Sequence, residues 1–228
     1  MAGTLGRRAL AEALGTGLLI VAIIGSGIMA QRLSPNDVGL QLLENAAATG
    51  AALVGLILIF GTVSGAHFNP AVTITARAHG TIDTPNAIIH VAAQIVGGCA
   101  GAILANVMFE LPAFELSTQT RSSGALWLSE VVATIGLLIV IHGCIRTGRS
   151  EAVPYAVGFW IAGAYWFTSS TSFANPAVTI ARTLSDSFAG IRPSSAPMFI
   201  VMQLIGTVIA LGLIAFLYPT PRPELSHV

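Results

Sequence analysis

The polar residues with the most regular placement in this chain are two asparagines, Asn69 and Asn175. Each begins the same six-residue sequence, Asn-Pro-Ala-Val-Thr-Ile. An asparagine amide has two N–H donors and a carbonyl acceptor, so it can bind water or a hydroxylated molecule without adding a charge. Asparagine followed by proline is also a helix start, because the asparagine caps the backbone and proline is tolerated at the first helical position. The motifs Asn69-Pro70-Ala71 and Asn175-Pro176-Ala177 therefore predict two equivalent helix starts, each with a hydrogen-bonding amide.

Two glutamates repeat in a similar way. Glu12 and Glu130 each lie early in an apolar stretch, in the related contexts Glu-Ala-Leu-Gly-Thr and Glu-Val-Val-Ala-Thr. A carboxylate in such surroundings is expensive and needs partners. One interpretation is a proton relay. The other, which we favour, is that each carboxylate accepts hydrogen bonds from an irregular backbone segment and fixes it in place.

The other reactive residues do not suggest catalysis. The sequence contains no recognisable pair of nucleophile and base and no cluster of metal ligands, so we expect neither an enzyme nor a cofactor or metal site. Cys99 and Cys144 fall within apolar stretches, where a free thiol acts as a small hydrophobic group. The ten basic and ten acidic side chains cancel. A net charge of zero argues against an electrostatic nucleic-acid surface.

The elements that must position these residues are those of a membrane protein. Of the 228 residues, 54% are hydrophobic and 9% are charged, and the mean hydropathy is +0.80. A soluble domain of this size would expose apolar patches beyond those that monomers tolerate. Runs long enough to cross about 30 Å of hydrocarbon occur at Ala9–Met29, Leu42–Val63, Asn86–Met108, Trp127–Cys144, Val153–Thr171 and Pro197–Tyr218.

The two motifs follow the second and fifth of these runs, in segments too short to cross. Non-helical backbone at membrane depth survives only when it is buried in protein or lines a water-filled cavity. We therefore expect an all-α membrane protein with six transmembrane helices and two re-entrant half-helices. It forms a single domain, 1–228, with an inverted 3+3 repeat: about 8–108 and about 125–218. The two helix starts should meet near the midplane with their positive ends facing each other. Two positive helix ends at the same level would repel cations from a pore between them.

Two further patterns bear on packing and orientation. Small residues at Gly97, Gly98, Gly101, Gly206 and Gly212 predict close helix contacts. The arginine distribution predicts a multi-pass protein of the cell inner (plasma) membrane with both termini cytoplasmic. It places Arg7, Arg8, Arg77, Arg146, Arg149 and Arg222 inside, and Arg32, Arg121, Arg182 and Arg192 outside.

The chain resembles the aquaporins and aquaglyceroporins. The resemblance runs from Glu12 to Tyr218 and is carried by the paired Asn-Pro-Ala motifs, the paired glutamates and the sequence Ser-Gly-Ala-His-Phe at 64–68. It implies a right-handed bundle of six helices with two half-helices, one pore per protomer, and a homotetramer in the lipid bilayer.

Within that resemblance, Asn69 and Asn175 present amides to permeating molecules at the pore centre. The carbonyls of Ser64–Phe68 and Ser170–Ala174 form a ladder of acceptors along an otherwise apolar wall. His67 is placed at the inner mouth, with a pore contact and a purely structural bond both open. His90 and His142 are expected to pack within the bundle or at its interface.

The sequence departs from the family at its filter. Members restricted to water carry arginine directly after the second Asn-Pro-Ala, and this chain has Val178 there. Alignment of the spans places the other filter positions at Thr49, Gly163 and Ser172. None of the four is aromatic or histidine, so a wide filter of weak polarity is expected, and strict water selectivity is not.

An arginine lies close by. Arg182 follows Val178 by four residues, so it projects from a similar face one turn further toward the exterior. We hypothesise that it places positive charge at the outer vestibule and tolerates or attracts anionic or strongly polar solutes. The alternatives are an ion pair with Asp186 and a side chain that snorkels to the interface.

A valine at this position, with small filter residues, resembles the bacterial arsenic-linked aquaporins, which pass arsenite, antimonite and methylated arsenicals. The expected function is a passive channel for small neutral solutes: metalloid acids, glycerol-like polyols and water. A plain water or glycerol channel is one alternative. A coupled secondary transporter, which also uses broken helices, is another, and a non-conducting structural role is a third.

Overall fold

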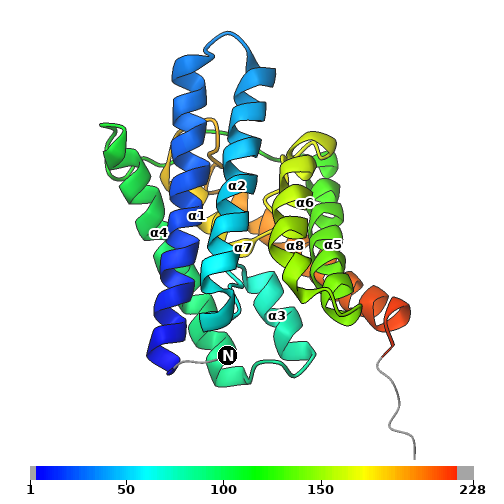
Figure 1. Cartoon of the computed structure of the whole chain (residues 1–228). Helices are drawn as coiled ribbons and strands as arrows, with labels where there is room; N and C mark the ends of the chain where they lie inside the picture. The colour runs from blue at the N-terminus through cyan, green and yellow to red at the C-terminus, as the bar shows by residue number, and fades with distance from the viewer. Residues whose placement is uncertain (1–3, 220–228) are drawn as a thin grey trace, which may run out of the picture.

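The computed structural model describes residues 4–219 and contains only helices and loops in that range. Its long helices form a bundle (Figure 1). They are α1 (Leu5–Leu33), α2 (Val38–Ser64), α4 (Thr84–Met108), α5 (Gly124–Arg146), α6 (Val153–Phe167) and α8 (Ala196–Leu217). Two short helices are α3 (Pro70–Ala78) and α7 (Pro176–Ala181), and two 3-10 turns are η1 (Ser150–Ala152) and η2 (Arg182–Leu184). The predicted architecture of six long helices and two half-helices is confirmed. Arg222, used above for orientation, lies outside the described residues.

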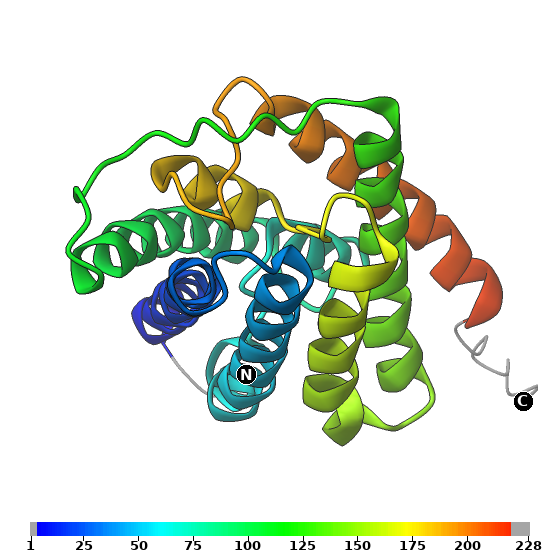
Figure 2. The same cartoon turned by 90° about the horizontal axis from the view of Figure 1, so that it is seen from above.

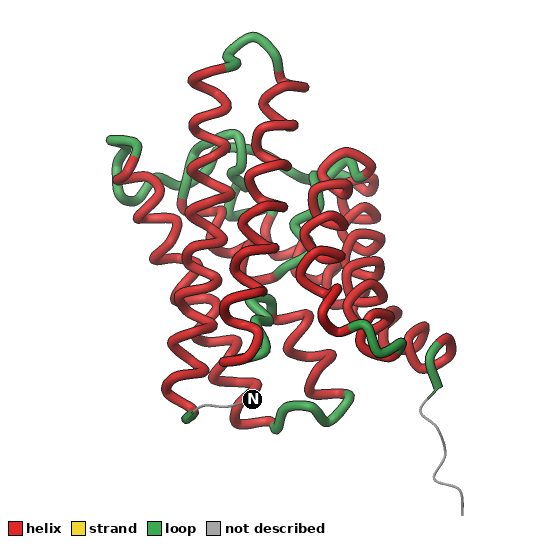
Figure 3. Tube along the Cα trace, in the orientation of Figure 1, coloured by secondary structure: helices red, strands yellow, loops and turns green. Residues whose placement is uncertain are grey.

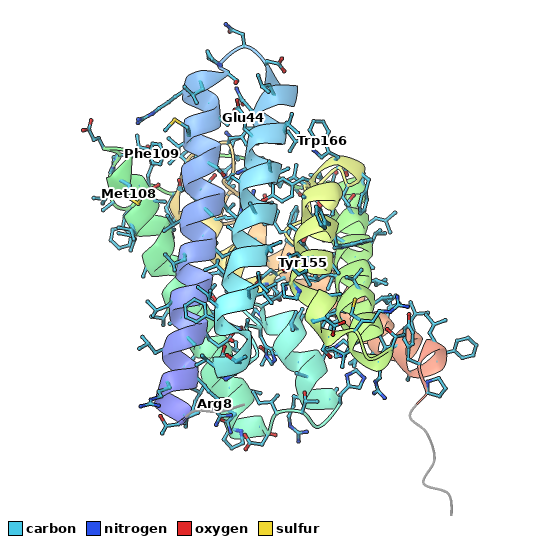
Figure 4. The ribbon with its side chains drawn as sticks, in the orientation of Figure 1. Arg8, Glu44, Met108, Phe109, Tyr155 and Trp166 are labelled. Atoms are coloured by element: carbon cyan, nitrogen blue, oxygen red, sulfur yellow. The ribbon has the colours of Figure 1, made fainter. Side chains whose placement is uncertain are left out.

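Side-chain chemistry is distributed as in a protein solvated by lipid. Large apolar side chains cover the outer faces of the helices, for example Phe159 at 75% and Phe216 at 83% exposure. Trp166 projects outward at one end of α6 (Figure 4), a placement typical of membrane interfaces. The interior contains many polar groups, including Glu12 and Glu130, both at 0% exposure. An apolar exterior, with the polar side chains of the spans kept inside the bundle, suits a bilayer.

Five of the long helices are long and apolar enough by themselves to cross a membrane, and α6 is the exception. The predicted fifth span, Val153–Thr171, is wrong at its end, because the helix stops at Phe167 and Thr168 adopts extended backbone. The 15 residues of α6 and the three residues of η1 together give a rod of about 28 Å. That length is close to the thickness of the hydrocarbon core.

The segments that lead into α3 and α7 are loops at mid-height in the bundle (Figure 3). From these loops α3 runs to the lower end of the view in Figure 1, and the chain after α7 rises toward the opposite end. Seen from above, the segment before α7, drawn in yellow, lies near the centre of the ring of helices (Figure 2). The half-helices therefore enter from opposite sides, as an inverted repeat requires.

Glycine allows the closest helix contacts. A Cβ on Gly97 would overlap the carbonyl oxygen of Ala13, and one on Gly101 would overlap that of Gly17, so α4 packs backbone to backbone on α1. A Cβ on Gly206 would lie 2.9 Å from the carbonyl oxygen of Val131. The packing contact predicted for Gly212 is not found within residues 4–219, where nothing lies within 4 Å of the position its Cβ would take.

We predict that Gly101→Ala lowers the stability of the protein in detergent by about 1–3 kcal/mol, because a rigid backbone carbonyl must move to admit the methyl group. Gly212→Ala is the matched control and is expected to leave the thermal unfolding midpoint unchanged. Equal midpoints for the two variants would contradict the contact between α1 and α4.

Candidate functional site

The two predicted helix caps are present. The Asn69 side chain accepts from the backbone nitrogen of Ala71 at 2.9 Å, and Pro70 occupies the first position of α3. Asn175 accepts from Ala177 at 3.0 Å and from Val178 at 3.2 Å, and Pro176 occupies the first position of α7.

The same two asparagines join the half-helices to each other. Nδ2 of Asn69 donates to the carbonyl of Ala174 at 2.8 Å, and Nδ2 of Asn175 donates to the carbonyl of Phe68 at 2.8 Å. Each carbonyl belongs to the residue just before the opposite motif, so the two bonds are reciprocal. An amide nitrogen has two hydrogens, and one on each asparagine is left over from this bond.

The first buried carboxylate holds the loop before α3. One oxygen of Glu12 accepts from the Ser64 hydroxyl at 2.6 Å and from the backbone nitrogen of His67 at 3.0 Å. The other accepts from the backbone nitrogen of Phe68 and from Nε2 of Gln94, both at 2.7 Å. Four donors converge on this one side chain.

The second carboxylate repeats the pattern before α7. Glu130 accepts from the Ser170 hydroxyl at 2.6 Å and from the backbone nitrogens of Phe173 and Ala174, each at 2.9 Å. Its fourth donor is Nε2 of Gln203 at 2.6 Å. Both carboxylates are occupied by fixed donors, which favours the loop-support interpretation over a proton relay.

Both loops are strained at equivalent positions. Ala66 and Phe68 have φ of 48° and 50°, and Ser172 and Ala174 both have φ of 49°. Left-handed backbone costs about 1–3 kcal/mol at a non-glycine residue and persists only where the surroundings impose it. Here the carboxylates impose it, by accepting from the backbone nitrogens in or next to these positions.

A cavity of about 450 Å³ passes between the half-helices. Asn69 and Asn175 both line it, as do His67 in the first loop and Ser172 in the second. Most of its remaining wall is aliphatic and comes from α1, α2, α5 and α6: Leu19, Ile23, Leu53, Ile57, Leu137, Ile141, Ile145, Val153, Val157 and Ile161. A few donors and acceptors on an apolar wall suit a small polar solute that must not bind tightly.

Three of the four predicted filter positions line this cavity: Thr49, Ser172 and Val178. The fourth, Gly163, is wrong. Cavity-lining residues recur along α6 every fourth position and include Ile161 and Tyr165, whereas Gly163 is not among them. The hydroxyl of Tyr165 lies 3.3 Å from that of Thr49. An aromatic hydroxyl therefore stands where a glycine was expected, and the cavity is more polar at this level than the sequence suggested.

Arg182 also lines the cavity, and both alternatives proposed for it are wrong. Its exposure is 1%, so the side chain does not snorkel. Nε donates to the carbonyl of Ala189. The Asp186 carboxylate accepts instead from the backbone nitrogen and hydroxyl of Thr118, at 2.9 and 3.0 Å, and within residues 4–219 no salt bridge joins it to Arg182.

The other end of the cavity contains residues that sequence reasoning did not assign to it. His79, His142 and Arg146 line this end, and the two imidazole centroids are 4.6 Å apart. Burial, together with the Arg146 cation, lowers the pKa of His79, which lies in the connection after α3. The signal in the sequence that could have placed His142 and Arg146 on the cavity wall is their helical spacing with Ile141 and Ile145, which share one face of α5. His90, by contrast, is fully buried, as expected.

His67 makes both of the contacts left open above. Its Nδ1 lies 3.1 Å from the hydroxyl of Thr73, on α3, and the residue also lines the cavity.

Comparison with known proteins identifies related chains. The family model described as major intrinsic protein matches residues 3–172 and 150–227. The chain is 50% identical to aquaglyceroporin AqpS of Rhizobium meliloti (strain 1021) over 97% of its own length and 94% of that protein. It is 32% identical to aquaporin Z of Bradyrhizobium diazoefficiens over 65% of its length and 67% of that protein. Its fold matches the aquaglyceroporin of Plasmodium falciparum with a TM-score of 0.73 at 21% identity, covering 92% of this chain and 95% of that one.

We predict that Glu130→Gln destabilises the folded protein by about 3 kcal/mol, because an amide NH2 replaces a carboxylate oxygen that accepts two hydrogen bonds from fixed donors. Solute flux should fall with it, since the loop before Asn175 loses its support. The exposed Glu151 provides the control. Thermal unfolding in detergent would measure the stability of both variants. A Glu130→Gln midpoint equal to that of Glu151→Gln would contradict the support role.

Proposed function

The chain belongs to the major intrinsic protein family, and on that premise we propose that it conducts small uncharged solutes, with metalloid acids and polyols ahead of water alone. Members of this family are passive membrane channels and not enzymes, so this multi-pass protein is a channel for solutes such as glycerol and water. The finer proposal concerns which solutes pass most readily.

The observation that carries the proposal is the cavity that passes between Asn69 and Asn175. A solute at this level meets the remaining N–H of each amide as a donor. Backbone carbonyls of the two strained loops serve as acceptors on either side. Neutral donors and acceptors on an aliphatic wall replace water of hydration without trapping the solute. The positive ends of the two half-helices face this level, which opposes protons and other cations.

Val178 supports a preference beyond water. In water-restricted members an arginine follows the second Asn-Pro-Ala, and valine at this position is smaller and has no donors. Arsenous acid is a neutral trihydroxy molecule at pH 7, as is its antimony analogue, so both can use the donors and acceptors that suit glycerol. The relative from Rhizobium meliloti is itself described as an aquaglyceroporin.

We also propose that the protein lies in the cell inner membrane with both termini cytoplasmic, and that it assembles as a homotetramer with one pore in each protomer. The arginine distribution supports the orientation. The family resemblance supports the tetramer. The exposed apolar faces of the long helices are available to lipid or to neighbouring protomers.

The test is stopped-flow swelling of proteoliposomes in gradients of glycerol, urea and arsenous acid, and shrinking in an impermeant osmolyte for water. We expect glycerol and arsenous acid to enter native proteoliposomes at least about tenfold faster than protein-free liposomes. Water flux without glycerol or arsenous acid flux would reduce the protein to a water channel. Absence of all fluxes would refute the channel itself.

Val178→Arg is predicted to reduce glycerol and arsenous acid permeability by about tenfold or more, because a bulky guanidinium enters a cavity that already contains Arg182. Val178→Leu adds volume without charge or donors and should have a smaller effect. The same swelling assay measures both variants. Fluxes equal to native in Val178→Arg would show that position 178 does not border the permeation path.

A further inference from the structure

Arg182 occupies an unusual place for an arginine. It is the bulkiest of the fully buried side chains, and it lines the same cavity as Val178, one helical turn earlier, and Thr49. Within residues 4–219 no salt bridge links it to a carboxylate, and Nη1 has no hydrogen-bond partner. A buried charge without a counterion is costly unless other contacts hold it.

Two contacts hold the guanidinium in one orientation. Nε donates to the carbonyl of Ala189, in the loop after η2. The guanidinium carbon lies 3.4 Å from the centroid of the Phe173 ring, a cation–π contact. On the side of α6, Tyr165 lines the same cavity as Arg182. A planar donor group held by a carbonyl and a ring is preorganised.

The side-chain hydroxyls of Tyr165 and Thr49 add polar groups to the same cavity wall. The hydroxyl of Tyr165 lies 3.3 Å from that of Thr49. Arg182, Tyr165 and Thr49 come from η2, α6 and α2, and all three line the cavity. We call this set the polar face of the filter. Val178 also lines the cavity at α7 and contributes no polar side-chain atom.

We propose that Arg182 is the filter cation of this channel. In water-restricted members the filter arginine stands at the position of Val178. Here the guanidinium comes from the turn after Val178 and takes the same role. The proposal rests on the channel function proposed above. The guanidinium excludes cations, and its free N–H groups bind solutes with adjacent oxygen atoms, the class to which polyols and metalloid hydroxides belong. The small side chain of Val178 compensates for the bulk of Arg182, because it leaves only one bulky group in that cross-section of the cavity.

The arrangement explains how a channel without arginine after its second motif can still reject protons. The facing half-helices supply one barrier. A fixed cation on the cavity wall supplies a second, which acts strongly on another cation because little water is available to screen it. Loss of the conventional arginine therefore does not leave the pore open to cations.

The experiment compares proton leak and glycerol permeability in proteoliposomes containing native protein, Arg182→Met, Arg182→Lys and the double variant Val178→Arg/Arg182→Val. Methionine keeps an unbranched side chain and removes the charge. Lysine keeps the charge and removes the planar fork. The double variant moves the guanidinium back to the conventional position. Arg192→Met is the matched control, because Arg192 is exposed and does not line the cavity.

We expect Arg182→Met to raise proton leak at least about tenfold and to lower glycerol permeability relative to water permeability. Arg182→Lys should keep leak near native and still lose glycerol preference. The double variant should restore low leak. Arg192→Met should match native protein in both assays.

Native leak and native glycerol preference in Arg182→Met would overturn the assignment. If Arg182→Met fails to fold, Arg182→Lys decides by itself, and an unchanged glycerol preference in that variant would overturn the proposal. These outcomes are separate from failure of the proposed function, which would appear as absent glycerol flux in native protein.

Discussion

The structure depends on two reciprocal hydrogen bonds, in which Asn69 and Asn175 each donate to the carbonyl just before the other's motif. These bonds place two helix starts against each other at mid-depth, where neither loop could exist alone. At that depth neither water nor lipid can supply hydrogen-bond partners to the exposed backbone groups of a loop. Glu12 and Glu130 each accept from two backbone nitrogens of the adjoining loop. The long helices surround this assembly, and the close glycine contacts between α1 and α4 keep them near it.

The cavity follows from the same constraint. Because the carboxylates and amides hold left-handed backbone at Ala66, Phe68, Ser172 and Ala174, the loops are kept in the open conformation that borders the cavity. Polar atoms therefore line the middle of a cavity whose other walls are mostly aliphatic. Selectivity then depends on a few side chains near α7, and the substitution that makes this chain unusual, Val178, acts together with Tyr165 and Arg182, which no motif marks.

The repeated features were predictable from sequence, because they are local. Asparagine before proline favours a helix cap, and a glutamate in an apolar stretch must find donors, so both pairs were identified correctly. The filter was harder, for two physical reasons. A span shows its helical period but not its rotation about its own axis, so Gly163 was chosen where Tyr165 lines the cavity. A long side chain such as Arg182 goes where distant groups receive it, and the carbonyl of Ala189 and the ring of Phe173 are not visible in the motif. The end of α6 was missed because Thr168 to Thr171 are as compatible with a span as with a loop.

The central claim is that solutes pass through a preformed path without coupling to another gradient. The most direct measurement is the initial rate of glycerol entry into proteoliposomes as a function of glycerol concentration, with and without an imposed proton gradient. A passive channel predicts a rate proportional to concentration and unaffected by the proton gradient. A rate that saturates at millimolar glycerol and rises with the proton gradient would contradict the account and favour a coupled transporter.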